Sequence, residues 1–183
     1  GFNRTYKPDI MLLDRMQRSL REAKQSLTLS SDNALNFASA VPLSLLTEKL
    51  PNVQLLPVTF SDLSPKEHFQ FGQSLKDSIM ASNKRIAVIA SGDLSHALTS
   101  NSPAGFTKEG AEFDEKLKEL ITQKNTAGLV SLDELMISNA HETLYRQLLI
   151  LFGVLERVSV APHVLSYESP FGVGYLVANL VLK

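Results

Sequence analysis

Residues Arg85 to Leu98 read RIAVIASGDLSHAL, and this stretch decides the fold that the sequence predicts. Residues 86–91 are apolar or small and include β-branched members, which is typical of a strand buried on both faces of a parallel sheet. Gly92 and Asp93 end the strand, and His96 follows in the loop. Ligand chemistry in open α/β sheets collects just beyond the carboxyl ends of the strands. His96 is therefore a candidate for proton transfer, and a hydrogen-bonded loop histidine is the alternative.

The elements on either side of this stretch alternate between helices and strands. Helices are indicated by apolar residues at helical spacing, by proline near a helix start and by capping boxes. Their order predicts one α/β domain over residues 1–183, a three-layer sandwich with a mixed, largely parallel central sheet and helices on both faces. The expected helices are 9–27, 39–50, 65–81, 112–123, a short one at the Ser131–Glu134 capping box, and 139–156, and the expected strands are 53–60, 86–91, 158–167 and 172–182.

Composition and charge exclude several classes of protein. The chain has 183 residues, a formal net charge of −1 and no cysteine. A charge so near zero leaves no basic footprint for nucleic acid. The lack of cysteine excludes a disulfide framework and a thiolate metal site, and no apolar run is long enough to cross a bilayer. We therefore expect a cytoplasmic protein that binds neither nucleic acid nor membrane.

Three segments carry the side chains with the greatest chemical capacity. They are SGDLSH after the predicted central strand, NAHETLYR near the start of a predicted helix, and SYESPFGVGY between the last two predicted strands. If these segments converge, they would form one site. The candidate residues are Asp93, Ser95 and His96 in the first segment, Glu142 in the second, and Tyr167, Glu168 and Phe171 in the third.

Spacing alone supports neither a serine hydrolase nor a complete metal site. Ser95 and His96 are neighbours, so their side chains point apart on an extended loop, and the G-x-S-x-G elbow is absent. Non-haem Fe(II) oxygenases use two histidines and one carboxylate. His141 and Glu142 would diverge by about 100° on a helix, and no H-x-H or H-x-x-x-H pair exists. We interpret His68 as a surface or packing residue, and His141 and His163 as capping or packing residues.

Taken together, the motifs resemble the class III extradiol ring-cleavage dioxygenases, the LigB-like family of the protocatechuate 4,5-dioxygenase β subunit. They resemble in particular the branch found with AmmeMemoRadiSam system protein A. The resemblance covers about residues 41–181. It is carried by RIAVIASGDLSHAL, GFTKEGAEFD, AHETLYRQLLILFGVL and VLSYESPFGVGYLVA, with looser matches in VPLSLL and LSPKEHFQFG.

This resemblance implies a role for each candidate residue. His96 matches the family's acid–base, which takes a proton from a catechol-type substrate and returns one during O–O cleavage. Glu142 matches the carboxylate ligand of the family's Fe(II), although it sits in AHET where a glycine would be expected before it. Asp93 and Ser95 would hold the loop. Tyr167, Glu168 and Phe171 would line or brace the site, and a tight turn between strands is the alternative for these three residues.

The chain departs from the family at the metal site. The family's two metal-binding histidines lie in P-H-P-like segments near the N-terminus, and this sequence contains neither. Where relatives carry D-H-G ahead of VPL, it reads Asn36, Phe37 and Ala38. We expect a fragment whose first strands and both histidines lie upstream of Gly1, or a degenerate domain without the metal. The alternative is that the chain is a non-catalytic module that binds a small molecule or a protein. Its protein partner would be another copy of the chain, in a homo-oligomer, or an AmmeMemoRadiSam domain.

Overall fold

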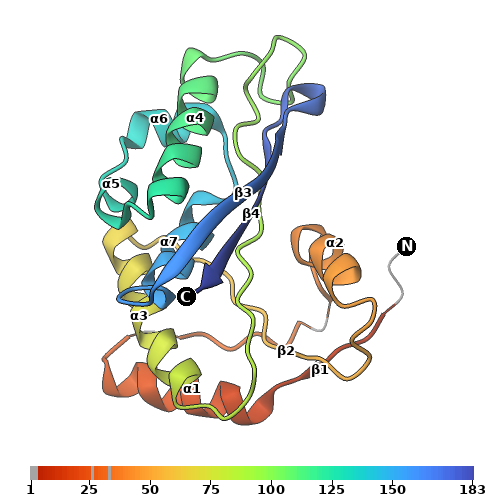
Figure 1. Ribbon diagram of the computed structural model, residues 1–183, viewed down its shortest axis with the longest axis vertical. Helices are drawn as coiled ribbons and strands as arrows, with labels where there is room; N and C mark the ends of the chain where they lie inside the picture. The colour runs from red at the N-terminus through yellow and green to blue at the C-terminus, as the bar shows by residue number, and fades with distance from the viewer. Residues whose placement is uncertain (1–3, 26, 33) are drawn as a thin grey trace.

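The structure is a computed structural model that describes residues 4–25, 27–32 and 34–183. It mixes helices and strands, as predicted. The helices are α1 (Ile10–Glu22), α2 (Phe37–Leu46), α3 (Pro65–Met80), α4 (Lys108–Gln123), α5 (Thr126–Val130), α6 (Glu134–Ala140) and α7 (Tyr145–Val154), and the strands are β1 (Lys7–Pro8), β2 (Gln54–Leu55), β3 (Val160–Glu168) and β4 (Tyr175–Leu182). In Figure 1, α4 to α7 lie on one side of the β3–β4 hairpin and α2 stands on the other.

Capping chemistry sets the start of α3 where the sequence predicts it. The Ser64 backbone N–H donates to the Glu67 carboxylate at 2.9 Å, and the Ser64 hydroxyl accepts from the Glu67 N–H. Pro65 occupies the first turn, where its missing N–H costs little. The prediction of this helix is confirmed, with an end one residue before the expected one.

The predicted helices between residues 131 and 156 are only partly correct. Asp133, and not Ser131, caps α6, because its carboxylate accepts the Met136 N–H at 3.1 Å. Ser131 instead ends α5, a short helix that the sequence did not predict. The single helix expected over 139–156 is divided at His141, whose left-handed backbone (φ 52°) ends α6 before α7 begins. This break places residues 141–144 in a connection rather than on a helix face.

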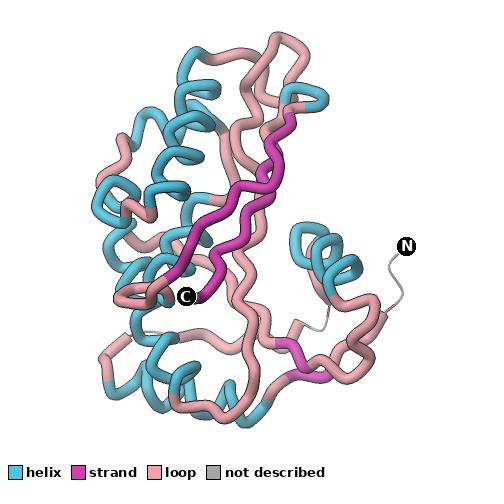
Figure 2. The backbone as a smooth tube through the Cα atoms, viewed as in Figure 1, coloured by secondary structure: helices cyan, strands magenta, loops and turns pink. Residues whose placement is uncertain are grey.

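The last two predicted strands form an antiparallel hairpin. Its register runs from Val160 opposite Leu182 to Glu168 opposite Tyr175, and Figure 2 shows these strands as the longest in the molecule. The sequence of β4 is almost entirely apolar, but the strand is not covered on both faces. Its side chains alternate between half-buried and exposed, because only one face of the hairpin packs against helices.

The predicted central strand does not form a ladder within the described part of the chain. Residues 85–90 carry no strand or helix and run as the long connection between α3 and α4 (Figure 2). Val88 and Ile89 are 40% and 45% exposed. The strand expected over 53–60 is reduced to β2, which pairs in parallel with β1. The described residues thus form two two-stranded sheets rather than one large parallel sheet.

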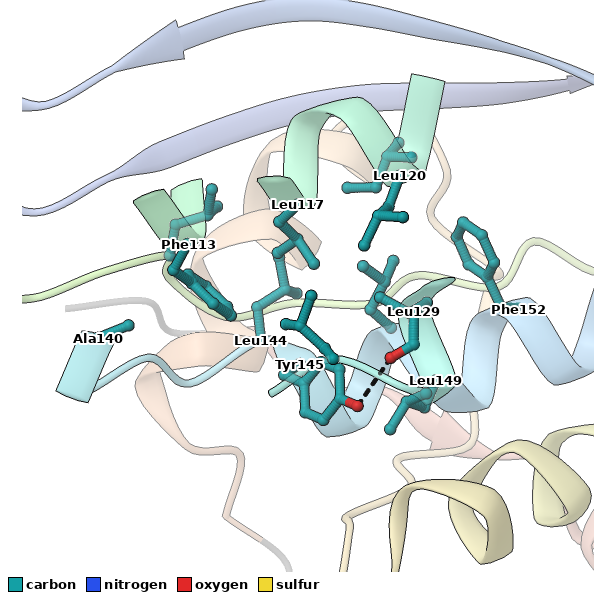
Figure 3. Close-up of a cluster of buried hydrophobic side chains, with 13 residues drawn as sticks. Phe113, Leu117, Leu120, Leu129, Ala140, Leu144, Tyr145, Leu149 and Phe152 are labelled. Carbon is teal, nitrogen blue, oxygen red and sulfur yellow. Dashed lines mark hydrogen bonds between the residues drawn. The ribbon is translucent and has the colours of Figure 1, made fainter. Parts of the chain in front are cut away.

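Two hydrophobic clusters share the α3–α7 helix pair. The larger cluster contains Leu94 and buried residues of α4 to α7 (Figure 3), and the smaller contains buried residues of α1, α3 and α7. Helices α3 and α7 approach each other closely at Gly72 and Gly153. An added Cβ on Gly72 would lie 2.1 Å from the Ile150 carbonyl oxygen, and an added Cβ on Gly153 would lie 2.1 Å from the Phe69 carbonyl oxygen. Glycine at both positions therefore allows direct backbone contact. None of the described helices has both the length and the apolar character that a bilayer crossing requires.

Candidate functional site

Backbone hydrogen bonds join the first two candidate segments. The Thr143 N–H donates to the Asp93 carbonyl at 3.0 Å, and the Asp93 N–H donates to the Thr143 hydroxyl at 2.8 Å. The His96 N–H donates to the Ala140 carbonyl at 2.9 Å. A Cβ on Gly92 would lie 2.4 Å from the Thr143 carbonyl oxygen, so this close approach requires glycine. The loop that carries His96 is therefore fixed beside the connection that carries Glu142.

The third segment lies along the other side of the same loop. The Leu94 N–H donates to the Gly174 carbonyl at 2.9 Å, and the Gly174 N–H donates to the Ser95 carbonyl at 2.8 Å. The Leu98 N–H donates to the Gly172 carbonyl at 3.3 Å. The three segments that the sequence singled out thus converge in the fold.

Ser95 is a buried structural residue of this loop. Its hydroxyl accepts the Ala97 N–H at 3.0 Å, and its own N–H donates to Asp114 Oδ1 at 2.8 Å. Its side chain has no exposed surface. These contacts fit the predicted role of holding the loop and leave no open face for a nucleophile.

His96 and Asp93 form a side-chain pair. His96 Nε2 lies 3.2 Å from Asp93 Oδ2. Because an ionised carboxylate only accepts hydrogen bonds, this contact requires a proton on Nε2, which in a neutral ring leaves the lone pair on Nδ1. Nδ1 has no hydrogen-bond partner among residues 4–25, 27–32 and 34–183. A histidine oriented by a carboxylate, with its other nitrogen unoccupied, is equipped to accept a proton.

Glu142 occupies the connection between α6 and α7. Its Oε2 accepts the Leu144 N–H at 2.6 Å and also the Tyr145 N–H, so it satisfies two backbone donors at the start of α7. Burial raises the pKa of the Glu142 carboxyl, and the two backbone hydrogen bonds oppose this shift. Glu142 is therefore half-buried, close to the His96 loop and partly committed to capping a helix.

A pocket of about 560 Å³ adjoins Glu142 and is lined by the start of α3, by α6 and by the start of α7. Its charged and polar lining includes Glu134, Arg146 and His68, whereas His96 does not line it. His68 is only 2% exposed, and its Nδ1 lies 3.0 Å from the Ser64 carbonyl oxygen. The interpretation of His68 as a packing residue is thus confirmed. Glu142 borders both the pocket and the His96 loop.

The remaining candidates occupy the end of the β3–β4 hairpin. The Tyr167 hydroxyl donates to Asp114 Oδ2 at 2.7 Å, so Tyr167 braces the site through Asp114. Glu168 is exposed, and Phe171 is 86% exposed with a left-handed backbone (φ 59°). The tight-turn alternative fits these two residues better than a lining role.

Asp114 is a buried residue of the site that sequence reasoning did not single out. It lies at helical spacing from Gly110, Leu117 and Ile121, which are all buried on α4. An aspartate within the apolar stripe of a helix was the available signal, because a buried carboxylate needs hydrogen-bond partners. Burial raises the pKa of Asp114, and its hydrogen bonds with Tyr167 and Ser95 lower it.

Comparison with known proteins identifies the family of this chain. Residues 5–178 match the model of the LigB family, described as the catalytic LigB subunit of aromatic ring-opening dioxygenase. The chain belongs to the LigB family. It is also 34% identical over 146 residues to Protein CA_C1420 of Clostridium acetobutylicum, a match that covers 80% of this chain. The chain spans 31% of the length of that relative.

Proposed function

We propose that this LigB-family chain supplies the acid–base part of an extradiol dioxygenase-type site that acts on catechol-type compounds with O2. The observation that carries the proposal is the His96–Asp93 pair, held by backbone hydrogen bonds beside Glu142. Family membership supports the reaction class. The motifs around residues 140–155 and 164–178 favour the branch associated with AmmeMemoRadiSam system protein A, and composition favours a cytoplasmic location.

His96 would accept the proton of a substrate hydroxyl at Nδ1. Asp93 would hold the ring through Nε2 and stabilise the imidazolium that forms, because a carboxylate interacts more strongly with a charged than with a neutral ring. A positioned acid–base of this kind is worth about 10²–10⁴-fold in rate. The same nitrogen could return the proton later in the reaction.

The family's Fe(II) does not fit the described residues by themselves. Within the described ranges, no group of three His, Asp or Glu side chains is placed to hold a metal ion. Glu142 uses Oε2 to cap α7, and His96 is hydrogen-bonded to Asp93. Proton transfer by His96 is therefore the chemistry that these residues support, and Glu142 is the single expected ligand among them.

We infer that protein outside residues 1–183 would supply the other ligands and complete a largely parallel sheet around residues 86–90. The exposure of the apolar Val88 and Ile89 supports this inference, because a strand of this composition is normally covered on both faces.

A second candidate function is a non-catalytic module that binds a small molecule or a partner, such as another copy or an AmmeMemoRadiSam domain. The capping of α7 by Glu142 favours it, because the same carboxylate serves the scaffold without a metal. The pocket beside Glu142 offers space for a small molecule.

The test uses the natural full-length protein, purified with iron, and measures bound metal and O2 uptake with catechol and protocatechuate. His96→Ala is expected to keep the metal and lose about 10²–10⁴-fold in turnover. Glu142→Ala is expected to lose metal first. His163→Ala is the matched control, because this exposed histidine lies on β3, apart from the three converging segments.

Two results would contradict the proposal. Loss of metal in His96→Ala would make His96 a ligand rather than an acid–base. A full-length protein that binds iron but consumes no O2 with either catechol, while a small aromatic compound still binds, would favour the non-catalytic module.

A further inference from the structure

Asp114 joins three separate parts of the fold through one carboxylate. It is 1% exposed on α4. Its Oδ1 accepts the Ser95 N–H at 2.8 Å, and its Oδ2 accepts the Tyr167 hydroxyl proton at 2.7 Å. A buried carboxylate is costly unless both oxygens are satisfied, and here each oxygen has a donor.

The space around this carboxylate is created by missing side chains. A Cβ on Gly174 would lie 2.1 Å from Asp114 Oδ2, and a Cβ on Gly110 would lie 2.6 Å from the Ser95 hydroxyl oxygen. Glycine at these two positions lets the His96 loop, α4 and the hairpin approach one another closely. A side chain at either position would clash with atoms of this junction.

Ser95 precedes His96 directly, so the position of the Ser95 backbone determines the position from which the His96 side chain extends. The amide of Ser95 is held by Asp114, its hydroxyl by Ala97 and its carbonyl by Gly174. Among these contacts the one with Asp114 involves an ionisable side chain, and hydrogen bonds to ionised groups are roughly twice as strong as neutral ones.

We propose that Asp114 is a positioning residue for His96, acting through the Ser95 amide and braced by Tyr167. This proposal rests on the proposed acid–base function of His96. The hydrogen bonds of Asp114 go to Ser95 and Tyr167 and not to the imidazole ring, so its effect is on ring orientation and on the ring tautomer that the bond to Asp93 selects.

The experiment compares Asp114→Asn with the wild type in the natural full-length protein. Asparagine keeps the size of the side chain but offers one acceptor oxygen to two donors. Two quantities are measured: the kcat and KM for catechol, and the tautomer of the His96 ring from its ¹⁵N chemical shifts. Glu119→Gln is the matched control, because this carboxylate lies on the outer face of the same helix.

We expect Asp114→Asn to lower kcat by about 10- to 100-fold with little change in KM, because misplacement of a catalytic group affects the chemical step. The wild-type ring should be protonated at Nε2, and the variant should show a mixture of tautomers. In a His96→Ala background, Asp114→Asn should add less than about 2-fold, since the residue that it positions is gone. An unchanged tautomer in the variant, or full additivity with His96→Ala, would overturn the proposal.

Tyr167→Phe provides a milder variant if Asp114→Asn does not fold. It removes the donor to Oδ2 and leaves the ring in place beside Lys118, whose ammonium lies 4.0 Å from the ring centroid. Its tautomer shift should have the same direction as that of Asp114→Asn and be smaller. If the wild type consumes no O2, the proposed function fails, whereas the ¹⁵N measurement still decides whether Asp114 positions His96.

Discussion

Two regions of this molecule differ in how completely they bury their apolar residues. The C-terminal region, residues 92–183, contains the larger hydrophobic cluster and all three converging segments. The N-terminal region, residues 4–91, contributes α1 and α3 to the smaller cluster and leaves large apolar side chains of α2 and of the 85–91 connection exposed.

The difference follows from how helices and strands satisfy their backbone. A helix closes its hydrogen bonds within one segment, so α4 to α7 need only side-chain partners to form a core. A strand needs a neighbouring strand, and residues 85–90 have none among the described residues. The apolar side chains of this connection therefore need to be covered, and the N-terminal region alone does not cover them.

The largest expected effect comes from truncating a buried side chain in the core of the C-terminal region. Leu149→Ala should lower the free energy of unfolding by about 2–5 kcal/mol, because Leu149 is fully buried. Leu46→Ala, at a site 60% exposed on α2, should change it by less than about 0.5 kcal/mol. Chemical denaturation measures both. Equal losses would show that the two regions do not differ as described.

Gly153→Ala tests the contact that joins the regions. The added methyl group would meet the Phe69 carbonyl oxygen at 2.1 Å, and a backbone atom cannot move aside cheaply. Thermal denaturation should show a loss of about 1–3 kcal/mol, the usual cost of overpacking. Gly72→Ala, on the facing helix, should give a loss of the same size, and a neutral result for either variant would contradict the close contact.

A pair of tyrosines compares hydrogen bonds in the two regions. The buried Tyr145 hydroxyl donates to the Leu129 carbonyl at 2.8 Å (Figure 3). Tyr145→Phe should cost about 1–3 kcal/mol, because the carbonyl loses its donor away from water. Tyr6→Phe, which removes a partly exposed bond to the Thr47 hydroxyl, should cost less than about 1 kcal/mol. The comparison fails if the two losses are reversed.

The smallest expected effect concerns the pH dependence of stability. Burial raises the pKa of Asp114 in the folded protein, despite the opposing effects of Tyr167, Ser95 and Lys118, while Glu115 adds to the increase. The folded protein therefore binds more protons than the unfolded chain between the two pKa values. The contribution of Asp114 to stability is therefore greatest below its unfolded pKa and is lost as the pH rises through its folded pKa.

Asp114→Asn removes this contribution. The decline in the denaturation midpoint as the pH rises above about 4, the ordinary pKa of an aspartate, should become shallower in the variant. Part of the decline should remain, because burial also raises the pKa of Glu142. A steeper decline in the variant would mean that the Asp114 pKa is lowered by folding.

Local patterns in the sequence predicted the elements that depend on local interactions. The Ser64–Glu67 capping box located α3, and the two predicted strands after residue 158 located the hairpin. The central strand could not be predicted in the same way, because an apolar pattern reports that a segment needs cover but not whether its partners are present. The break at His141 was missed because a single left-handed residue leaves little trace in helical spacing.

The site was predicted as three segments, and the fold brings them together. Their convergence could be anticipated from the resemblance, whereas the hydrogen bonds that hold them could not be read from spacing. Asp114 and Thr143 illustrate the reason, since each joins segments that lie far apart in the chain. The partial commitment of Glu142 to α7 likewise appears only in the geometry.

The backbone contact between Gly72 and Gly153 also governs how the molecule comes apart. The α3–α7 pair faces the larger cluster through Phe69 and Leu149, and the smaller cluster through Leu75 and Ile150. Neither cluster can open fully without separating the two helices. We therefore expect the two regions, despite their unequal burial, to lose structure in a single cooperative transition, with the slowest-exchanging amide protons in α3 and α7.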